Sequence, residues 1–417
     1  MRTESLAIGS EKPKERLGLI VFNLSILLAF ILPHTSFGLM AIHALLPIVL
    51  FFFTKRDEDR GPFSILILVY MLGVFIFNVF LPVTELGEKD LFRLAQYLLL
   101  IGLFPFVDKV EILNLTLYIV LSVIVISQLA YVIDYTPVVN LVNSVYFSNE
   151  DIAGISYERY QDAAGDLSSI LRMRYGGIYG NANQYGRFLD LWLVVYLIEN
   201  QKAPTFRLVL IFAIVTMSTL LTGSRTALGT LSVILFFFLF SLRKGRVKGV
   251  QSTAIRLLIA VGLIITPIIY VTLYALDIRS FDLSSGLQNS LEVKWKWLLN
   301  AVLQIDFWHL LFGSFTSSNV EQVFEGTAML DSEWGEALFC FGVIGLFIYI
   351  AVVIKLLRRR CASLSFYLVI LLWGISSTVF FNFRMSLLFM LFLSKYYTES
   401  KSNPNQIKTY GTLYLSI

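Results

Sequence analysis

The stretch from Ile112 to Ile133, ILNLTLYIVLSVIVISQLAYVI, contains no charged side chain. A helix of this length, at about 1.5 Å per residue, covers the ~30 Å of hydrocarbon in a bilayer. Its apolar residues are continuous, whereas a strand of a membrane barrel alternates apolar and polar residues. The stretch therefore predicts a transmembrane helix, and similar runs recur along the chain.

The composition of the whole chain agrees with a membrane protein. Hydrophobic residues make up 57% of the 417 residues and charged residues 15%, against about 25% charged residues in soluble domains. The mean hydropathy is +0.73, and the 35 Phe, 20 Tyr and 6 Trp suit helices that contact lipid and carry aromatic residues near the headgroups. A disordered chain, a coiled coil and a collagen helix are excluded.

Apolar runs long enough to cross a bilayer occur twelve times. The sequence therefore predicts an all-α polytopic membrane protein with about 12 transmembrane helices. The charged segment from Met1 to Arg16 has no small-residue cleavage site after it, so the first run is expected to be a retained span. The runs lie near 17–33, 37–53, 62–82, 91–107, 112–133, 185–199, 206–222, 226–242, 254–276, 333–357, 362–381 and 384–397.

Lysine and arginine residues orient these predicted helices. With the amino terminus in the cytoplasm, the loops and tails on that side hold 22 of the 33 basic residues and 10 of the 29 acidic residues. Short cytoplasmic loops carry an excess of Lys and Arg. An even number of spans then places both termini in the cytoplasm, with 398–417 as a cytoplasmic tail.

Two predicted connections are much longer than the others, and both lie on the extracytoplasmic side. They cover 134–184 and 277–332, and they separate three blocks of helices at 1–133, 185–276 and 333–397. Long loops on a rigid scaffold often carry function, so we expect the working face outside. No ATP is available there, and the chain has no GxxxxGK[ST] motif, so a reaction must use an activated substrate.

Metal, cofactor and nucleic-acid binding are not indicated. The chain has no HExxH or CxxC motif, and its three histidines are His34, His43 and His309. Cys340 and Cys361 lie in an apolar run and beside an arginine cluster, without the spacing of a disulfide framework or metal site. The net charge of +4 follows membrane topology, so we expect no nucleic-acid partner and no cofactor.

The densest candidate site ends the first long loop, where residues 172–187 read RMRYGGIYGNANQYGR. Its glycines predict turns with positive φ, and its backbone amides can approach a ligand closely. A helix amino terminus follows and favours anions, and guanidinium groups match phosphate oxygens. Alternatively, the arginines only reach towards headgroups. The predicted anion-binding residues are Arg172, Arg174, Gly177, Gly180, Asn181 and Asn183.

A second candidate is Arg225, in the turn LTGSRTA between two long apolar runs at 221–227. The predicted topology places this arginine outside, where the positive-inside rule makes it unexpected. A charged residue at membrane depth is a functional candidate. The alternative is again a single arginine that reaches the headgroups.

In this order the motifs resemble the O-antigen polymerase and O-antigen ligase superfamily. The resemblance rests on an Arg before Gly-x-Tyr-Gly-Asn-x-Asn-x-x-Gly, the Thr-Gly-Ser-Arg turn and the later FGVIGL at 341–346, and it covers about 172–349. It implies a bacterial glycosyltransferase of the cytoplasmic (inner) membrane that uses a polyprenyl-pyrophosphate-linked oligosaccharide outside. Arg174, with Arg172, and Arg225 would bind the pyrophosphate. Membrane lipids, a chain-length regulator and a flippase are the implied partners.

The second long loop favours the polymerase over the ligase. Ligases of this superfamily carry a His just before the span that follows this loop, whereas this chain has Asp331 there. The expected function is therefore an O-antigen or capsule polymerase, with Asp331 as the general base and Glu333 and Glu336 as rivals. His309 is flanked by aromatic and aliphatic residues, which is typical of a packing residue.

The same loop also departs from the superfamily pattern. Where an Arg precedes a Trp in many members, this chain has Lys294 before Trp295, so Lys294 or the earlier Arg279 would have to bind substrate. The segment around Trp295 has apolar residues at helical spacing and is expected to lie flat on the outer leaflet. The ligase and a transporter or flippase remain alternatives, and a transporter is expected to have broken helices near the membrane midplane.

Overall fold

The computed structural model describes residues 13–32, 62–82, 112–146, 175–179, 182–200, 205–241, 296–314, 333–360, 385 and 387–388. All regular elements in these ranges are helices, which confirms the predicted all-α class for this part of the chain. The spans predicted near 37–53, 91–107, 254–276 and 362–381 lie outside it. The elements are α1 (Pro13–Ile31), α3 (Pro62–Phe80), α5 (Asn114–Val132), α6 (Thr136–Tyr146), η1 (Gly177–Tyr179), α9 (Ala182–Glu199), α10 (Thr205–Leu221), α11 (Arg225–Ser241), α14 (Phe307–Phe312) and α16 (Glu333–Arg360); residues 296–304 are also helical.

Helix α5 is long and apolar enough to cross a membrane, and it alone passes this test among the described residues. Its end is sharp, because Asp134 adopts a left-handed conformation with φ of 53°, which Asp tolerates better than most residues. The chain then turns into α6, whose Val139 and Val142 are buried. The sequence predicted loop here, and the burial of these two valines explains why the first part of it is helical.

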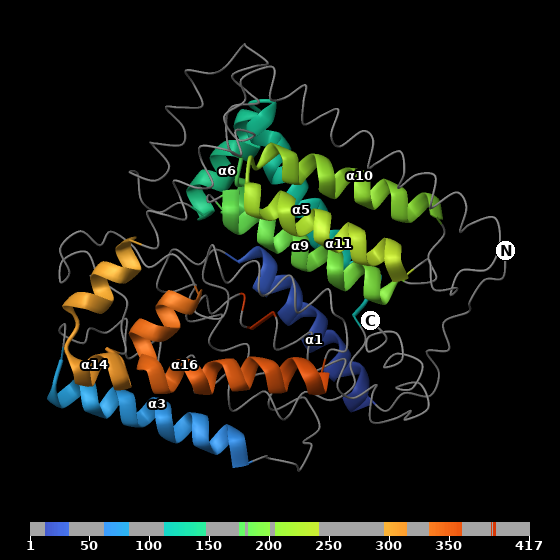
Figure 1. The fold of residues 1–417 in the computed structure, drawn as a ribbon. Coiled ribbons are helices and arrows are strands. Elements are labelled where there is room, and N and C mark those ends of the chain that lie inside the picture. Colours follow the sequence, from blue (N-terminus) through green and yellow to red (C-terminus); the bar gives the residue numbers. More distant parts are fainter. Residues whose placement is uncertain are drawn as a thin grey trace.

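Helices α5, α9, α10 and α11 form one bundle, with α9 at its centre (Figure 1). The large side chains of Tyr185, Phe188, Trp192 and Tyr196 on α9 are all less than 2% exposed. Trp192 donates its indole N–H to the Leu117 carbonyl at 2.8 Å, while Tyr185 lies nearer the carboxyl end of α5. Helix α9 is therefore antiparallel to α5.

Helix α1 joins this bundle through a buried polar contact. Asn23 accepts a hydrogen bond from the backbone N–H of Leu113 at 2.8 Å and another from Thr116 Oγ1 at 3.0 Å. Both donors lie at the start of α5, where backbone N–H groups lack partners within the helix. The side chain of Asn23 thus fixes α1 against the amino end of α5.

Helices α3, α14 and α16 form a second group, in which α3 and α16 lie side by side (Figure 1). Helix α16 is interrupted at Gly342, which has φ of 66° and ψ of −175°. The span predicted at 333–357 is thus helical but broken in its first half. The break frees backbone carbonyl groups, and other segments supply their donors.

Many large apolar side chains lie on the surface of both groups. Ile126 on α5 is 57% exposed, Phe206 on α10 is 78% exposed and Phe347 on α16 is 69% exposed. The exposed large apolar side chains lie on several helices of both groups, and a contiguous apolar surface contacts lipid or another protein.

Candidate functional site

The structure describes part of the site predicted from the sequence. Gly177 lies in η1, Asn183 lies in the first turn of α9, and Arg225 is the first residue of α11. The predicted site residues that lie outside the described residues are Arg172, Arg174, Gly180, Asn181, Arg279, Lys294 and Asp331.

The segment 175–179 packs directly on α5 at Gly177. Gly177 has φ of 48°, which confirms the predicted positive φ at this position. A Cβ atom there would lie 2.7 Å from Ser127 Oγ and 3.2 Å from the backbone nitrogen of Gln128, so a side chain fits neither the conformation nor the space. The next residue, Ile178, donates its N–H to Ser127 Oγ at 3.3 Å. Glycine is therefore required for this close approach.

Gln128 joins this segment to α10. Its Nε2 donates to the carbonyl oxygens of Tyr175 at 3.1 Å and Ser218 at 3.0 Å. Its Oε1 accepts a hydrogen bond from the Ser218 hydroxyl, and Tyr185 Oη lies 3.0 Å from it. We call Gln128, Tyr175, Tyr185 and Ser218 the Gln128 network. It is fully buried at Gln128, and every amide hydrogen of that side chain has an acceptor.

The turn between α10 and α11 is built to start a helix. Gly223 has φ of 56°, and Thr222 Oγ1 accepts the backbone N–H of Ser224 at 3.0 Å. Ser224 then caps α11, because its Oγ accepts the N–H of Ala227 at 3.3 Å. The sequence predicted a minimal turn here, and the helix bounds confirm it.

The two predicted motifs meet at this turn. Ser224 donates its hydroxyl hydrogen to Asn183 Oδ1 at 2.9 Å, and the N–H of Tyr175 donates to the Leu221 carbonyl at 3.1 Å. The residue before Tyr175 is Arg174 and the residue after Ser224 is Arg225. Both arginine-bearing motifs are thus anchored at the end of α10.

Helices α9 and α11 are parallel, and their amino ends lie together. Asn183 pairs with Ser224, and one turn later a Cβ on Gly186 would lie 2.3 Å from the Cβ of Ala227. The same offset in both pairs shows that the helices run in one direction in close contact. Each helix amino terminus carries about half a positive charge, so this end of the pair favours an anion.

Two charged side chains of α9 are buried below this end. Arg187 is 6% exposed and Asp190 is 0% exposed. They are three residues apart and so lie on the same face of the helix. Buried charges in proteins are normally compensated.

Tyrosines around the segment are held in fixed positions. The ring of Tyr179 stacks on Phe188 with centroids 4.3 Å apart, and its hydroxyl donates to the Phe30 carbonyl on α1 at 2.7 Å. Burial raises the pKa of Tyr175 to about 12. Its phenol therefore stays neutral at physiological pH.

Sequence reasoning missed Ser127, Gln128, Tyr185 and Ser218, which hold the segment in place. Ser127 and Gln128 interrupt the apolar run at 112–133 that predicted a transmembrane helix. Polar residues inside such a run are expensive and usually have a specific role. This signal was present in the sequence, but the partners of Gln128 come from residues far away along the chain.

The third predicted motif, FGVIGL at 341–346, contacts the end of α14 and the residues that follow it. A Cβ on Gly313 would lie 2.3 Å from the Cys340 carbonyl oxygen, and a Cβ on Gly342 would lie 2.3 Å from the Leu311 carbonyl oxygen. The N–H of Ser314 donates to the Phe339 carbonyl at 2.9 Å. Two backbones therefore interlock at these glycines.

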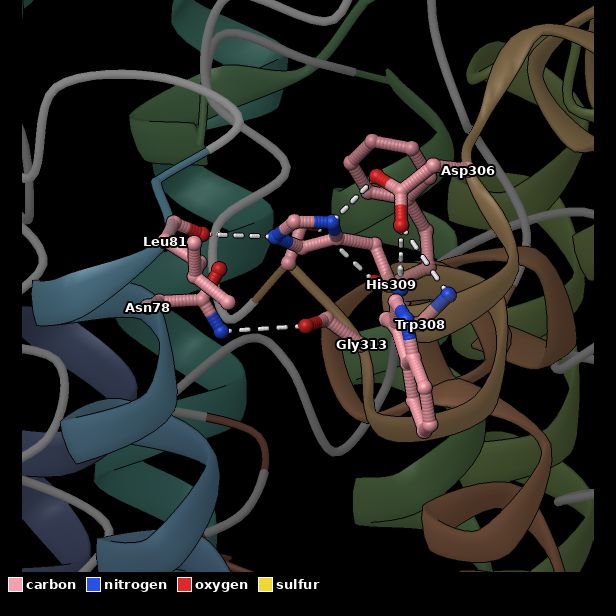
Figure 2. Close-up of polar contacts among 8 residues, drawn as sticks. Asn78, Leu81, Asp306, Trp308, His309 and Gly313 are labelled. Carbon is pink, nitrogen blue, oxygen red and sulfur yellow. Dashed lines mark hydrogen bonds and ion pairs between the residues drawn. The ribbon is translucent and has the colours of Figure 1, made fainter.

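Helix α3 contacts α16 and the end of α14, and its contacts with His309 and Gly313 are drawn in Figure 2. Asn78 Nδ2 donates to the Gly313 carbonyl at 3.0 Å, and Tyr70 Oη donates to the Phe341 carbonyl at 2.6 Å. The imidazole of His309 contacts both Asp306 and the Leu81 carbonyl. His309 is 7% exposed, as expected of a packing residue.

Among the described residues, no cluster of three or more His, Cys, Asp or Glu side chains could hold a metal ion. The chain matches no protein-family model, and no curated protein matches it either. Its function has to be inferred from its own residues.

Proposed function

We propose that the protein is a glycosyltransferase in the bacterial cytoplasmic membrane that polymerises a polysaccharide, O-antigen or capsule, from a polyprenyl-pyrophosphate-linked donor on the outer face. The observation that carries this proposal is the meeting of the two arginine-bearing motifs. Tyr175, next to Arg174, is bonded to the end of α10, and Asn183 is bonded to Ser224, next to Arg225. The amino termini of α9 and α11 lie together at this turn.

This arrangement suits a diphosphate leaving group. An acceptor hydroxyl on a lipid-linked repeat unit attacks the anomeric carbon, the bond to the pyrophosphate breaks, and negative charge builds on the departing oxygen. Arg174 and Arg225 stabilise that charge in the transition state, and loss of one such preorganised donor costs about 2.7–4 kcal/mol of barrier. The proton of the hydroxyl passes to a carboxylate, for which Asp331 is our candidate. Direct attack inverts the anomeric carbon.

The directions of the helices and the exposed apolar side chains both support a membrane location. Helix α9 is antiparallel to α5 and parallel to α11, as expected if every second span crosses in the same direction. Ile126 and Phe347 expose large apolar side chains, which lipid would cover. The full proposal has about twelve spans, both termini in the cytoplasm and the segments 175–179 and 306–314 outside.

The arginines are tested in cells that make the polysaccharide. Arg174→Ala and Arg225→Ala are each expected to abolish long-chain product while the protein inserts at normal levels. Arg207→Ala is the matched control, because Arg207 is exposed near the start of α10, at the end away from the turn. Normal chain-length ladders in both site variants would disprove the site. Lys variants are expected to fail where the planar guanidinium is needed.

A transporter or flippase is the second candidate, and the break of α16 at Gly342 favours it, since broken helices are common at transporter binding sites. Purified protein in liposomes with a synthetic lipid-linked repeat unit separates the two. Elongation of the glycan supports the polymerase, and translocation without elongation supports the flippase. Transfer to lipid A core instead identifies a ligase.

A further inference from the structure

Helix α6 is attached to the bundle along one face. It packs against α5 and against η1 (Figure 1). Its residues Val139 and Val142 are buried, and Val142 belongs to the main core of the bundle. The hydroxyl of Tyr131, close to the end of α5, donates to Asn143 Oδ1 at 2.5 Å. These contacts fix how α6 is rotated about its own axis.

The exposed side of α6 is divided lengthwise into an apolar and a polar stripe. Residues four apart lie above one another on a helix. Leu141 and Val145 form the apolar stripe and are 61% and 47% exposed. Asn140 and Ser144 form the polar stripe and are exposed as well. At about 3.6 residues per turn, the apolar stripe lies between the buried valines and the polar stripe. The apolar part of the helix is therefore wider than its contact with the protein.

The position of α6 along the chain places it at the end of a span. Helix α5 has 19 residues and is about 28 Å long, close to the ~30 Å of hydrocarbon in a bilayer. The residues from Ile133 to Tyr135 connect it to α6, and the positive φ of Asp134 turns the chain there. Tyr135 is 53% exposed, and tyrosine is enriched at the level of the headgroups. Helix α6 thus begins where α5 leaves the hydrocarbon.

We propose that α6 is an interfacial helix that binds the outer leaflet, with Leu141 and Val145 among the lipid acyl chains and Asn140 and Ser144 at the headgroups. Interfacial helices bury their apolar face about 5–10 Å into the boundary between headgroups and acyl chains. Helix α6 contains no charged side chain, so no charge enters this layer. The proposal rests on the membrane location put forward under the proposed function and does not depend on transferase activity.

Lipid fits the apolar stripe better than a second protein does. Exposed apolar side chains cover α5 up to its end, where Ile126 is 57% exposed and Ile133, just beyond the helix, is 70% exposed. A protein partner on α6 would have to cover side chains on both sides of the turn at Asp134. Acyl chains adapt to such a surface, because they have no fixed shape.

An interfacial α6 sets the depth of the segment beside it. Helix α6 packs against η1, and η1 begins three residues after Arg174. The anchored helix would hold the segment 175–179 at the level of the headgroups. The diphosphate of a polyprenyl-linked donor lies at this level as well, because its polyprenyl chain is in the hydrocarbon.

Fluorescence quenching of the full-length protein in phosphatidylcholine vesicles tests the proposal. Cys340 and Cys361, the two cysteines of the chain, are first replaced by Ala. An environment-sensitive dye is then attached to one new cysteine at a time. The positions are Leu141→Cys and Val145→Cys in the apolar stripe, and Asn140→Cys and Ser144→Cys in the polar stripe as matched controls on the same helix. All four native side chains are exposed, so the dye does not disturb the core.

The two stripes are expected to behave differently. Dyes at 141 and 145 should emit at shorter wavelength, and lipids with a doxyl group near the headgroup should quench them more than lipids with the doxyl group near the chain end. Dyes at 140 and 144 should emit at longer wavelength and be quenched by iodide in the water. Iodide quenching at all four positions would overturn the proposal, since water would then cover both stripes.

Two other outcomes would overturn it as well. Stronger quenching of 141 and 145 by the deep doxyl group would place α6 inside the hydrocarbon. Protection of both positions from every quencher would show that protein covers the apolar stripe. Ile126→Cys on α5 separates the proposal from the membrane location, because a dye there should be quenched most by the deep doxyl group. Absence of that quenching would remove the membrane location itself, whatever the result for α6.

Discussion

The Gln128 network and the contacts of α3 and α16 with residues 306–314 hold two segments in similar ways. In each case a glycine with positive φ, Gly177 or Gly313, lies against a neighbouring backbone with no room for a Cβ atom. In each case a buried side-chain amide, Gln128 or Asn78, donates to a carbonyl of the segment. Side-chain amides do this well inside a bundle because they supply donors without a charge.

The difference between the two regions is electrostatic. The Gln128 network consists of amide, hydroxyl and backbone groups that stay neutral over the physiological range. The second region adds an imidazole and a carboxylate to the amide anchor of Asn78. The first region is therefore held by neutral groups, whereas the second adds the contact of an imidazole and a carboxylate to a neutral anchor. The following predictions test this comparison.

The largest expected effect is steric. Gly313→Ala places a Cβ 2.3 Å from the Cys340 carbonyl oxygen at a φ of 94°, which combines a backbone clash with backbone strain. We expect a loss of roughly 3 kcal/mol or more, measured as a large drop in the melting temperature of the purified protein. Gly73→Ala on α3 is the control, because a Cβ there meets no atom within 4 Å. Equal stability of the two variants would contradict the interlocked backbones.

The next prediction compares the loss of stability when each of the two buried amides, Gln128 and Asn78, is replaced. Gln128→Leu removes the donor to both Tyr175 and Ser218, at about 1–3 kcal/mol for each polar group left unsatisfied. Asn78→Leu orphans the Gly313 carbonyl and should cost less. Melting temperatures of the two variants test the order. Polysaccharide chain length is also expected to fall with Gln128→Leu, because Tyr175 lies next to Arg174. A larger drop in melting temperature for Asn78→Leu than for Gln128→Leu would contradict this order.

A smaller effect is expected at the helix cap. Ser224→Ala removes the cap of α11 and the bond to Asn183, which costs about 1 kcal/mol. Ser224→Thr keeps a hydroxyl and is expected to recover most of the stability and activity. Thermal unfolding and polysaccharide length are measured together for both variants. If Ala and Thr behave alike, the hydroxyl does not join the two motifs.

The smallest expected effect is a change in hydrogen exchange at acid pH. Because the pKa of Asp306 is lowered in the folded chain, its contribution is present above the ordinary pKa range of Asp and is lost as pH falls through its lowered folded-state pKa. Its side chain is about half exposed, so solvent screens the effect. Hydrogen exchange of 306–314 is expected to speed up at acid pH in wild type and to change less in Asp306→Asn. The peptide that contains Gln128 should show no such change.

Sequence patterns predicted the parts of the molecule that depend on local residues. Continuous apolar runs predicted α5, α10 and α11, the Thr-Gly-Ser-Arg turn predicted the short connection before Arg225, and the glycine-rich motif predicted positive φ at Gly177. Each follows from residues that are neighbours in the chain. The same patterns predicted loop at α6, where two buried valines outweigh the loop-like surroundings.

The contacts that decide the site could not be predicted in this way. The partners of Gln128 come from residues 175 and 218, and the break of α16 at Gly342 depends on the backbone near Leu311. Such contacts depend on how the helices pack, and the hydrophobic periodicity of the sequence does not predict them. His309 was predicted as a packing residue from its apolar neighbours, and that description omitted Asp306, three residues earlier, which contacts the ring.

The buried indole of Trp192 has a practical consequence. It stacks on Tyr196 with centroids 5.0 Å apart and is hydrogen-bonded to α5, so its fluorescence is a built-in optical probe of the contact between these helices. A version of the chain that keeps Trp192 and carries Phe at the other five tryptophans would emit at short wavelength while the bundle is closed. A red shift upon addition of a lipid-linked sugar would then reveal, without any attached dye, that substrate loosens the centre of the protein.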